Sequence, residues 1–161
     1  MYFLDKIDCE IVRHLQNNAR LSNKELAAAI GLSPSSCLER VRRLQENGLF
    51  SGFHAALNPK AVGIGMQAMI AVRLSGHSLD TVESFRRYIL EQPTVIGVFH
   101  ITGENDFLIH IAVTDADHLR STLLSTFSTR PEVIHIETSI IFEYSRAHEM
   151  PVYTQKDHLM L

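Results

Sequence analysis

Two short helices joined by a tight turn are encoded between residues 22 and 48, and this pair limits the chain to few folds. Ser22 and Glu25 have the S-x-x-E spacing of a capping box, which starts a helix. Gly31 can adopt the left-handed conformation that commonly ends one. Ser33 followed by Pro34 caps the next helix, because proline at the first helical position loses no hydrogen bond. The segment therefore predicts helix, turn and helix.

A supporting helix precedes this pair. Asp5 can cap it, and the Asn17-Asn18 dipeptide is a turn signal at its end. Gly48 ends the last helix of the three. Three helices with a glycine-containing turn between the last two form the helix-turn-helix arrangement, in which the second helix of the pair enters the major groove of DNA.

The helix after the turn is basic, although the whole chain has a formal net charge of −3. It carries Arg40, Arg42 and Arg43. Residues 1–58 contain seven basic and six acidic side chains, whereas residues 59–161 contain eight basic and twelve acidic ones. A local basic patch attracts DNA phosphates more directly than net charge does, so we expect the two halves to have different partners.

In the helix-turn-helix arrangement the first residues of the recognition helix face the bases. We expect Ser35, Ser36 and Glu39 there, because small hydroxyls let a helix approach the groove floor. Alternatively, the arginines form an ordinary solvated face that pairs along the helix with Glu39 and Glu46. The predicted DNA-binding residues are Ser33, Ser35, Ser36 and Glu39, with Arg40 and Arg43 at base edges or phosphates and Lys24 and Arg42 at phosphates.

The segment after these helices separates the two halves. Residues 49–57 alternate apolar and polar side chains well enough to predict a short strand or wing, and Asn58-Pro59 breaks it. We expect residues 58–66 to be a linker.

The second half predicts four strands and two helices in the order β-α-β-β-α-β. This is the ferredoxin-like unit, a four-stranded antiparallel sheet with both helices on one face. The other face is left bare, so we expect two copies to associate sheet to sheet. The predicted strands are 67–75, 94–102, 106–114 and 132–145, and the helices are 79–90 and one capped by Asp115 with Leu119, Leu123 and Phe127 on its inner face.

The "LD-x-x-D" opening, the "LS-x-S-x-x-x-x-R-V-x-x-L-x-x-x-G" recognition helix and the "G-x-x-D" turn in "TGENDFLIHI" occur together here. In these motifs the chain resembles the Lrp/AsnC (leucine-responsive regulatory protein/asparagine regulator, feast/famine) family of transcription factors. The resemblance implies a DNA-binding regulator that forms dimers and commonly octamers, and an amino-acid effector bound where dimers meet. The expected α+β architecture has a winged helix-turn-helix domain in 1–57, a linker in 58–66, a ferredoxin-like effector-binding and oligomerisation domain in 67–152, and a tail in 153–161.

A glycine-started turn could supply the groups that an amino acid needs. Main-chain N–H groups in such a turn can bind a carboxylate, and a neighbouring side-chain carboxylate can bind the ammonium. The alternative is an ordinary hairpin turn, which glycine, asparagine and aspartate favour for conformational reasons. The predicted effector-binding residues are Gly103, Glu104, Asn105, Asp106, Thr138 and Ser139.

Other classes of function have weaker support. His100, His110 and His135 fall on three predicted strands and could in principle bind zinc, but they lack the short spacing of a zinc motif. Cys9 and Cys37 predict two reduced thiols. No apolar run is long enough for a membrane span and no signal-peptide pattern occurs, so we expect a cytoplasmic protein. No P-loop, H-E-x-x-H or G-x-S-x-G motif occurs either, so we expect a non-enzymatic protein without a cofactor. A DNA-bending protein that needs no effector is the remaining alternative.

Overall fold

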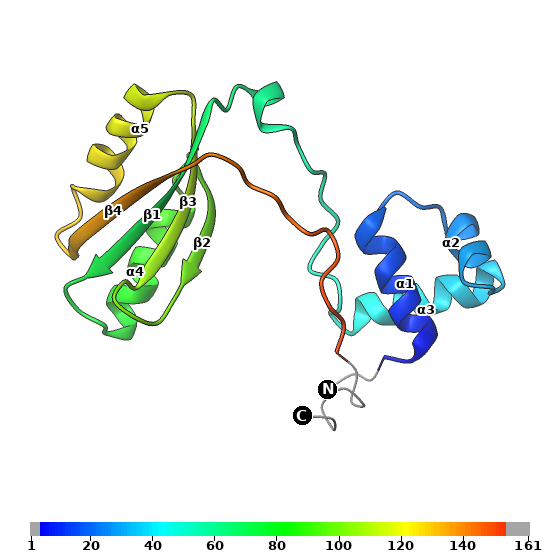
Figure 1. Cartoon of the computed structure of the whole chain (residues 1–161). Helices are drawn as coiled ribbons and strands as arrows, with labels where there is room; N and C mark the ends of the chain where they lie inside the picture. The colour runs from blue at the N-terminus through cyan, green and yellow to red at the C-terminus, as the bar shows by residue number, and fades with distance from the viewer. Residues whose placement is uncertain (1–3, 154–161) are drawn as a thin grey trace. The chain divides into compact units, whose positions relative to one another are not determined.

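The computed structural model describes residues 4–153, which form two compact units (Figure 1). The first unit comprises the described residues up to 56 and those from 145 onward, and the second comprises residues 57–144. This division differs from the sequence-based one, which assigned residues 145–152 to the second domain. Of the predicted tail, all but Tyr153 lies outside the described residues.

Three helices build the first unit: α1 (Lys6–Asn17), α2 (Asn23–Ala29) and α3 (Pro34–Glu46). Each begins after the capping residue that the sequence predicts. Asp5 and Ser22 make capping boxes, and the Ser33 hydroxyl caps α3. Gly31 and Gly48 follow α2 and α3 with positive φ angles of 68° and 70°. The helix-turn-helix arrangement is confirmed.

An apolar core holds these helices together. Burial raises the pKa of the Cys37 thiol, so this side chain packs as a small apolar group. Cys9 is partly buried and forms no disulfide bond with Cys37. The buried core residues are Ile11, Val12, Leu15, Leu26, Ala27, Cys37 and Leu44, which recur at helical spacing on the inner faces.

The short strand predicted for residues 49–57 is wrong. These residues have neither helical nor strand structure. Phe50 instead packs against the apolar core, and its ring centroid lies 5.4 Å from that of Phe53. A strand needs a hydrogen-bonded neighbour, and the described part of the first unit contains no second strand. The apolar residues of this segment therefore serve packing rather than pairing.

The predicted linker contains one short 3₁₀ helix, η1 (Pro59–Val62), which Asn58 caps. Gly65 then joins the sheet, where its main-chain N–H donates to the carbonyl of Val113 at 3.1 Å. A Cβ atom at Gly65 would overlap the carbonyl oxygen of Thr114, so this close approach requires glycine.

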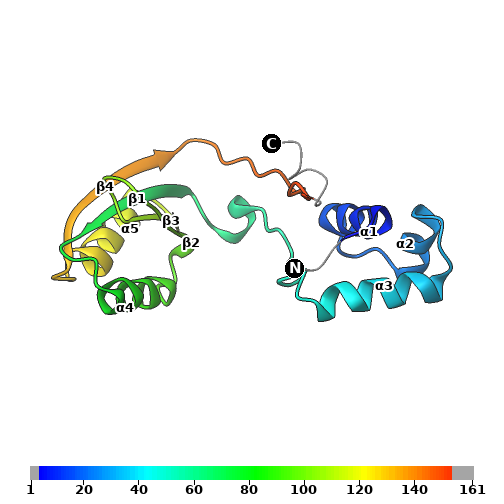
Figure 2. The same cartoon turned by 90° about the horizontal axis from the view of Figure 1, so that it is seen from below.

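The second unit is a four-stranded antiparallel sheet in the order β2-β3-β1-β4, with α4 and α5 on the same side (Figure 2). The ferredoxin-like arrangement is thereby confirmed. A π-helical turn, η2 (Leu123–Phe127), continues α5 and keeps Phe127 buried. The elements are β1 (Met66–Leu74), α4 (Leu79–Leu90), β2 (Val95–His100), β3 (Phe107–Val113), α5 (Ala116–Thr122) and β4 (Val133–Ile141).

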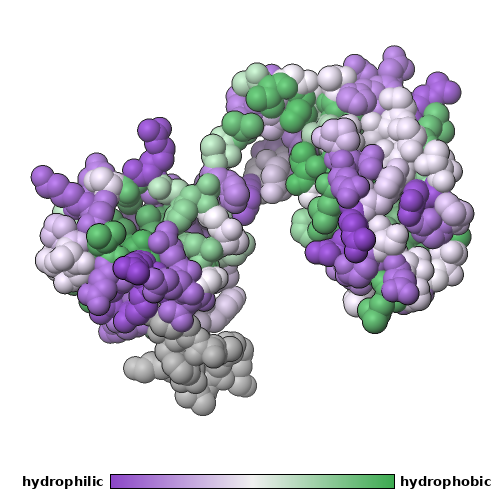
Figure 3. Space-filling model, turned by 180° about the vertical axis from the view of Figure 1, so that it is seen from behind, coloured by the Kyte–Doolittle hydropathy of each residue, from purple (hydrophilic) through white to green (hydrophobic). Residues whose placement is uncertain are grey.

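The two faces of the sheet differ in burial. On β1, Ile70 and Val72 face the helices and are fully buried, whereas Met69 and Ala71 point to the other side, which we call the open face. Phe99 on β2 is 54% exposed and pairs with Leu108 of β3 on that open face. Apolar residues remain at the surface of both units (Figure 3).

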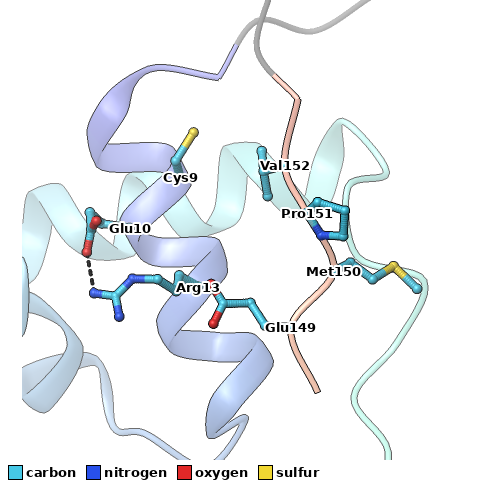
Figure 4. A pocket seen from close by; sticks show the side chains of 7 residues that line it. All are labelled: Cys9, Glu10, Arg13, Glu149, Met150, Pro151 and Val152. Carbon is cyan, nitrogen blue, oxygen red and sulfur yellow. Dashed lines mark hydrogen bonds and ion pairs between the residues drawn. The ribbon is translucent and has the colours of Figure 1, made fainter. Parts of the chain in front are cut away.

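Residues 145–153, which we call the C-terminal clasp, belong to the first unit, and residues 149–152 lie beside α1 (Figure 4). The side-chain amide of Gln16 makes two hydrogen bonds with the main chain of Met150: it donates to the carbonyl at 3.3 Å and accepts from the N–H at 2.7 Å. Asn17 donates to the Glu149 carboxylate at 3.2 Å. Val152 packs against the apolar core of the three helices. The clasp is therefore part of the first unit.

Candidate functional site

The N-terminus of α3 carries a cluster of serine hydroxyls. The Ser33 Oγ accepts a hydrogen bond from the main-chain N–H of Ser36 at 3.2 Å. It also lies 3.1 Å from Ser35 Oγ and 2.9 Å from Ser36 Oγ. These serines and Glu39 are exposed. They form a polar, uncovered helix end of small side chains, which suits close approach to base edges and phosphates.

Arg40 and Arg43 are held by acidic residues of α1. Arg40 Nη1 donates to Asp5 Oδ2 at 2.6 Å and to Asp8 Oδ1 at 2.8 Å. Arg43 Nη2 lies 3.1 and 3.2 Å from the two oxygens of Asp8. The Asp8 side chain is 1% exposed, whereas that of Arg40 is 26% and that of Arg43 47% exposed. The two guanidinium groups thus neutralise a buried carboxylate and hold α3 against the first turn of α1.

Arg42 differs from these two arginines. It pairs along α3 with Glu46 at 2.7 Å, and its side chain is 77% exposed. The alternative interpretation, in which the arginines form a solvated face that pairs along the helix, therefore holds for Arg42. Its exposed side chain remains accessible to a phosphate.

The ion pairs between α1 and α3 shift the pKa values of Asp5 and Arg40. Partial burial opposes ionisation of Asp5, but hydrogen bonds from Arg40 and from the main-chain N–H of Asp8 outweigh it, so the pKa of Asp5 falls below its usual value. Hydrogen bonds to Asp5 and Asp8 raise the pKa of Arg40. Asp5 and Arg40 both stay charged at neutral pH.

Lys24 lies exposed on α2. Its neighbour Asn23 donates from Nδ2 to the carbonyl of Pro34 at 2.7 Å, which ties the start of α2 to the start of α3. All eight predicted DNA-binding residues therefore belong to one unit, seven of them on α3 or its cap.

The turn between β2 and β3 carries four of the predicted effector-binding residues. Gly103 has a φ of 123°, which favours glycine. The Asp106 carboxylate accepts from the main-chain N–H of Leu74 at 2.7 Å and lies 2.8 Å from His77 Nε2. The main-chain N–H of Asp106 also donates to the carbonyl of Val72 at 2.9 Å. Asp106 therefore anchors the turn to the end of β1.

Two family models match the chain. A model of the AsnC-type helix-turn-helix domain covers residues 4–45, and a model of the Lrp/AsnC ligand-binding domain covers residues 67–149. The chain belongs to the Lrp/AsnC family. It is a transcriptional regulator with a helix-turn-helix DNA-binding domain and a ligand-binding domain.

Relatives of this Lrp/AsnC protein agree with that assignment. The HTH-type transcriptional regulator AldR of Mycolicibacterium smegmatis is 40% identical over 89% of this chain and 84% of its own. A transcriptional regulator of Neisseria meningitidis, solved in complex with L-methionine, is 32% identical with a TM-score of 0.84 over 97% of this chain and 99% of its own. The feast or famine regulatory protein of Mycobacterium tuberculosis, complexed with L-methionine, is 28% identical with a TM-score of 0.81, over 93% and 99% of the two chains.

Thr138 and Ser139 are not brought to the turn within one Lrp/AsnC chain. Thr138 pairs with the buried Ile70 and so faces the helices, whereas Ser139 pairs with Met69 on the open face. The turn lies beyond Val72 at the end of β1, about 10 Å along the strand from Met69. The turn leads into β3, and β1 separates β3 from β4, which carries Thr138 and Ser139.

The three strand histidines do not assemble a metal site. In the described range 4–153, no three His, Cys, Asp or Glu side chains come together as metal ligands. His110 Nε2 lies 2.8 Å from Gln67 Oε1, and burial lowers the pKa of His110. The His100 ring stacks on Phe107 with centroids 4.8 Å apart. None of the helices in that range is long and apolar enough to cross a membrane.

Sequence reasoning missed three residues that shape these sites. Asp8 entered only as the last residue of the "LD-x-x-D" motif, and its pairing with two arginines spaced three apart on the recognition helix was not predicted. Asn23 and His77 had no recognisable signal, because their partners lie far along the chain.

Proposed function

We propose that this Lrp/AsnC regulator binds specific DNA sequences through α3 and that an amino acid bound at the turn 103–106 changes its DNA affinity or assembly. The observation that carries the DNA part is the capped recognition helix with exposed Ser35, Ser36 and Glu39 at its base-facing end. The domain order, with a ligand-binding domain behind it, supports the response to an effector.

The arginines have divided roles in this proposal. Arg42 and Lys24 contact phosphates, because both are exposed. Arg40 and Arg43 hold α3 on α1 through Asp8, and their exposed parts reach the DNA backbone or base edges. Ser33 caps α3 and orients its N-terminus toward phosphate.

An amino acid is the proposed effector. Two structural neighbours are complexes with L-methionine, which makes L-methionine the first probe. In this chain the main chain of Gly103, Glu104 and Asn105 contacts the ligand, and Asp106 keeps the turn in place. Thr138 and Ser139 contribute only if a second copy brings them to the turn.

We also propose that the open sheet face joins two copies, and that dimers assemble further into octamers. Phe99, Leu108 and Met69 give this face an apolar centre. Two-fold symmetry would then require operators with two similar half-sites about one helical turn apart or a multiple of it. The cytoplasmic location expected from the sequence stays a prediction.

Selection from randomised duplex DNA tests the function. The full chain is used to enrich DNA with and without each proteinogenic amino acid, and binding to the enriched duplex is then titrated at fixed salt. We expect a symmetric motif whose affinity for the protein changes with at least one amino acid. Failure to enrich any motif would contradict sequence-specific binding.

A protein that bends DNA without an effector is the second candidate, because Asp106 and its turn also make sense as plain structure. In that case the enriched duplex binds equally with every amino acid, while bending persists in a gel-mobility assay.

A further inference from the structure

Two buried side-chain polar atoms lack a hydrogen-bond partner in the part of the chain that the structure describes: Arg73 Nε and Asn105 Oδ1. Buried polar groups are nearly always hydrogen-bonded, so an unpaired one needs an explanation. A ligand that supplies the missing partners is one such explanation, and it is attractive where a donor and an acceptor lie unpaired near each other.

The register of the sheet puts Arg73 and Asn105 at the same end of the neighbouring strands β1 and β3. Val72 of β1 pairs with Phe107 of β3. The main-chain N–H of Asp106 donates to the carbonyl of Val72, and the Leu74 N–H donates to the Asp106 carboxylate. These two hydrogen bonds extend the pairing of β1 with β3 by one residue beyond the regular strands. Arg73, which lies between Val72 and Leu74, is therefore next to the turn that contains Asn105.

The other charged side chains at this end of the strands either already have hydrogen-bond partners or form only a weak ion pair. Asp106 uses its carboxylate on Leu74 and His77. Glu104 lies 3.7 Å from Arg73 Nη1, and its side chain is 81% exposed. This pair is long and solvated, so a carboxylate that approaches Nε can displace Glu104 at little cost.

An α-amino acid fits this donor and acceptor. Its carboxylate accepts hydrogen bonds, which the guanidinium donates in a planar, charge-assisted geometry. Its ammonium donates, and an amide oxygen accepts. One ligand of this class therefore satisfies both orphaned atoms.

We propose that Arg73 binds the carboxylate and Asn105 Oδ1 the ammonium of the amino-acid effector, while Asp106 is a positioning residue that holds the turn. This assignment rests on the proposed function and names the residues that recognise the zwitterion. It also moves the ammonium contact from Asp106 to Asn105 and adds a β1 residue to the effector site.

Ligand analogues test each half separately in the full chain. L-Methionine, L-methioninamide, which lacks the carboxylate charge, and N-acetyl-L-methionine, which lacks the ammonium, are titrated by calorimetry. The parent should prefer L-methionine over either analogue by at least about tenfold. In Arg73→Ala the preference over the amide should fall to near unity, and in Asn105→Ala the preference over the N-acetyl form should do so.

Control variants separate local recognition from general charge or folding effects. Arg87→Ala removes an exposed arginine of α4 and should keep both preferences. Arg73→Lys keeps the charge but lacks Nε, so it should retain only part of the preference over the amide. Thermal unfolding of each variant is recorded without ligand, so that a change in preference is read on folded protein.

Three results would overturn the assignment in distinguishable ways. Absence of stabilisation by L-methionine and by every other amino acid would remove the effector function together with this site. Binding by the parent with unchanged preferences in Arg73→Ala and Asn105→Ala would remove only this site. Loss of dimerisation in Arg73→Ala with both preferences intact would mean that Nε pairs with a second copy.

Discussion

The contact between Asp8 and the two arginines of α3 should make Arg40 a stability residue as well as a DNA-binding candidate. Arg40→Ala removes two short charged hydrogen bonds and leaves the buried Asp8 with Arg43 and a main-chain N–H from Asp5 at 3.3 Å. Breaking a buried pair costs about 3 to 5 kcal/mol, and the remaining partners offset part of that. We expect the first unit to lose about 2 to 3 kcal/mol.

The three arginines should rank differently in stability and in DNA binding. Arg43 is more exposed than Arg40 and makes longer contacts, so Arg43→Ala should cost about 1 to 2 kcal/mol of stability and weaken DNA binding by about 1 to 3 kcal/mol. Arg42→Ala should stay within about 0.5 kcal/mol of the parent in stability. It should weaken specific and random DNA alike and reduce the salt slope by roughly one.

Urea unfolding of the full chain, followed by amide exchange in α1 and α3, measures the stability term. With an m-value of about 1 kcal/mol/M for a unit of this size, Arg40→Ala should lower the midpoint by roughly 2 to 3 M. Arg42→Ala is the matched control on the same helix. A double-mutant cycle with Asp8→Asn should give a coupling energy of at least about 1 kcal/mol. Equal midpoints for Arg40→Ala and Arg42→Ala would refute the claim that Asp8 holds α3 in place.

Three further results are expected. Asp106→Ala should destabilise the second unit by about 1.5 to 3 kcal/mol and abolish the effector response while leaving ligand-free DNA affinity unchanged, and a variant that keeps the response would return the turn to a plain hairpin. Burial lowers the pKa of His110 below 6.5, so the unfolded chain binds this proton first and stability should fall as the pH drops below about 6.5; His110→Gln should flatten that dependence in pH-resolved thermal unfolding. Gln16→Ala should cost about 0.5 to 1.5 kcal/mol and speed amide exchange in the C-terminal clasp, whereas unchanged exchange would mean that Val152 alone holds it.

Local patterns predicted the elements well because their causes are local. The caps Asp5, Ser22 and Ser33 act within a few residues of themselves, and each marks a helix start in the structure. Burial alternates along β1 because only one face of the sheet is covered by helices. The four-stranded sheet with both helices on one face was predicted from the number and order of the elements. The strand expected in 49–57 failed because pairing needs a neighbour that alternation alone does not provide.

The contacts that define the sites were less accessible from the sequence. Asp106 bonds to Leu74, which is 32 residues away, through the exact register of two strands. The clasp contact of Met150 with Gln16 uses main-chain atoms, which carry no side-chain signature. Arg73 is one of several basic residues in the sequence, and only the burial of its Nε distinguishes it.

The pairing of the recognition helix with α1 also bears on how this protein can read DNA. Residues 1–58 have a net charge of only +1, so uniform attraction to phosphates is weak and binding to random DNA should be weak as well. Within that total, Asp8 offsets part of the charge of Arg40 and Arg43, the basic residues that it contacts on α3. The same ion pairs order the side chains of Arg40 and Arg43 before DNA binds, so DNA binding costs less side-chain entropy. Under the proposed function, specificity would then depend on the exposed Ser35 and Ser36 meeting the right bases, and useful affinity would depend on two such helices acting together in the proposed dimer.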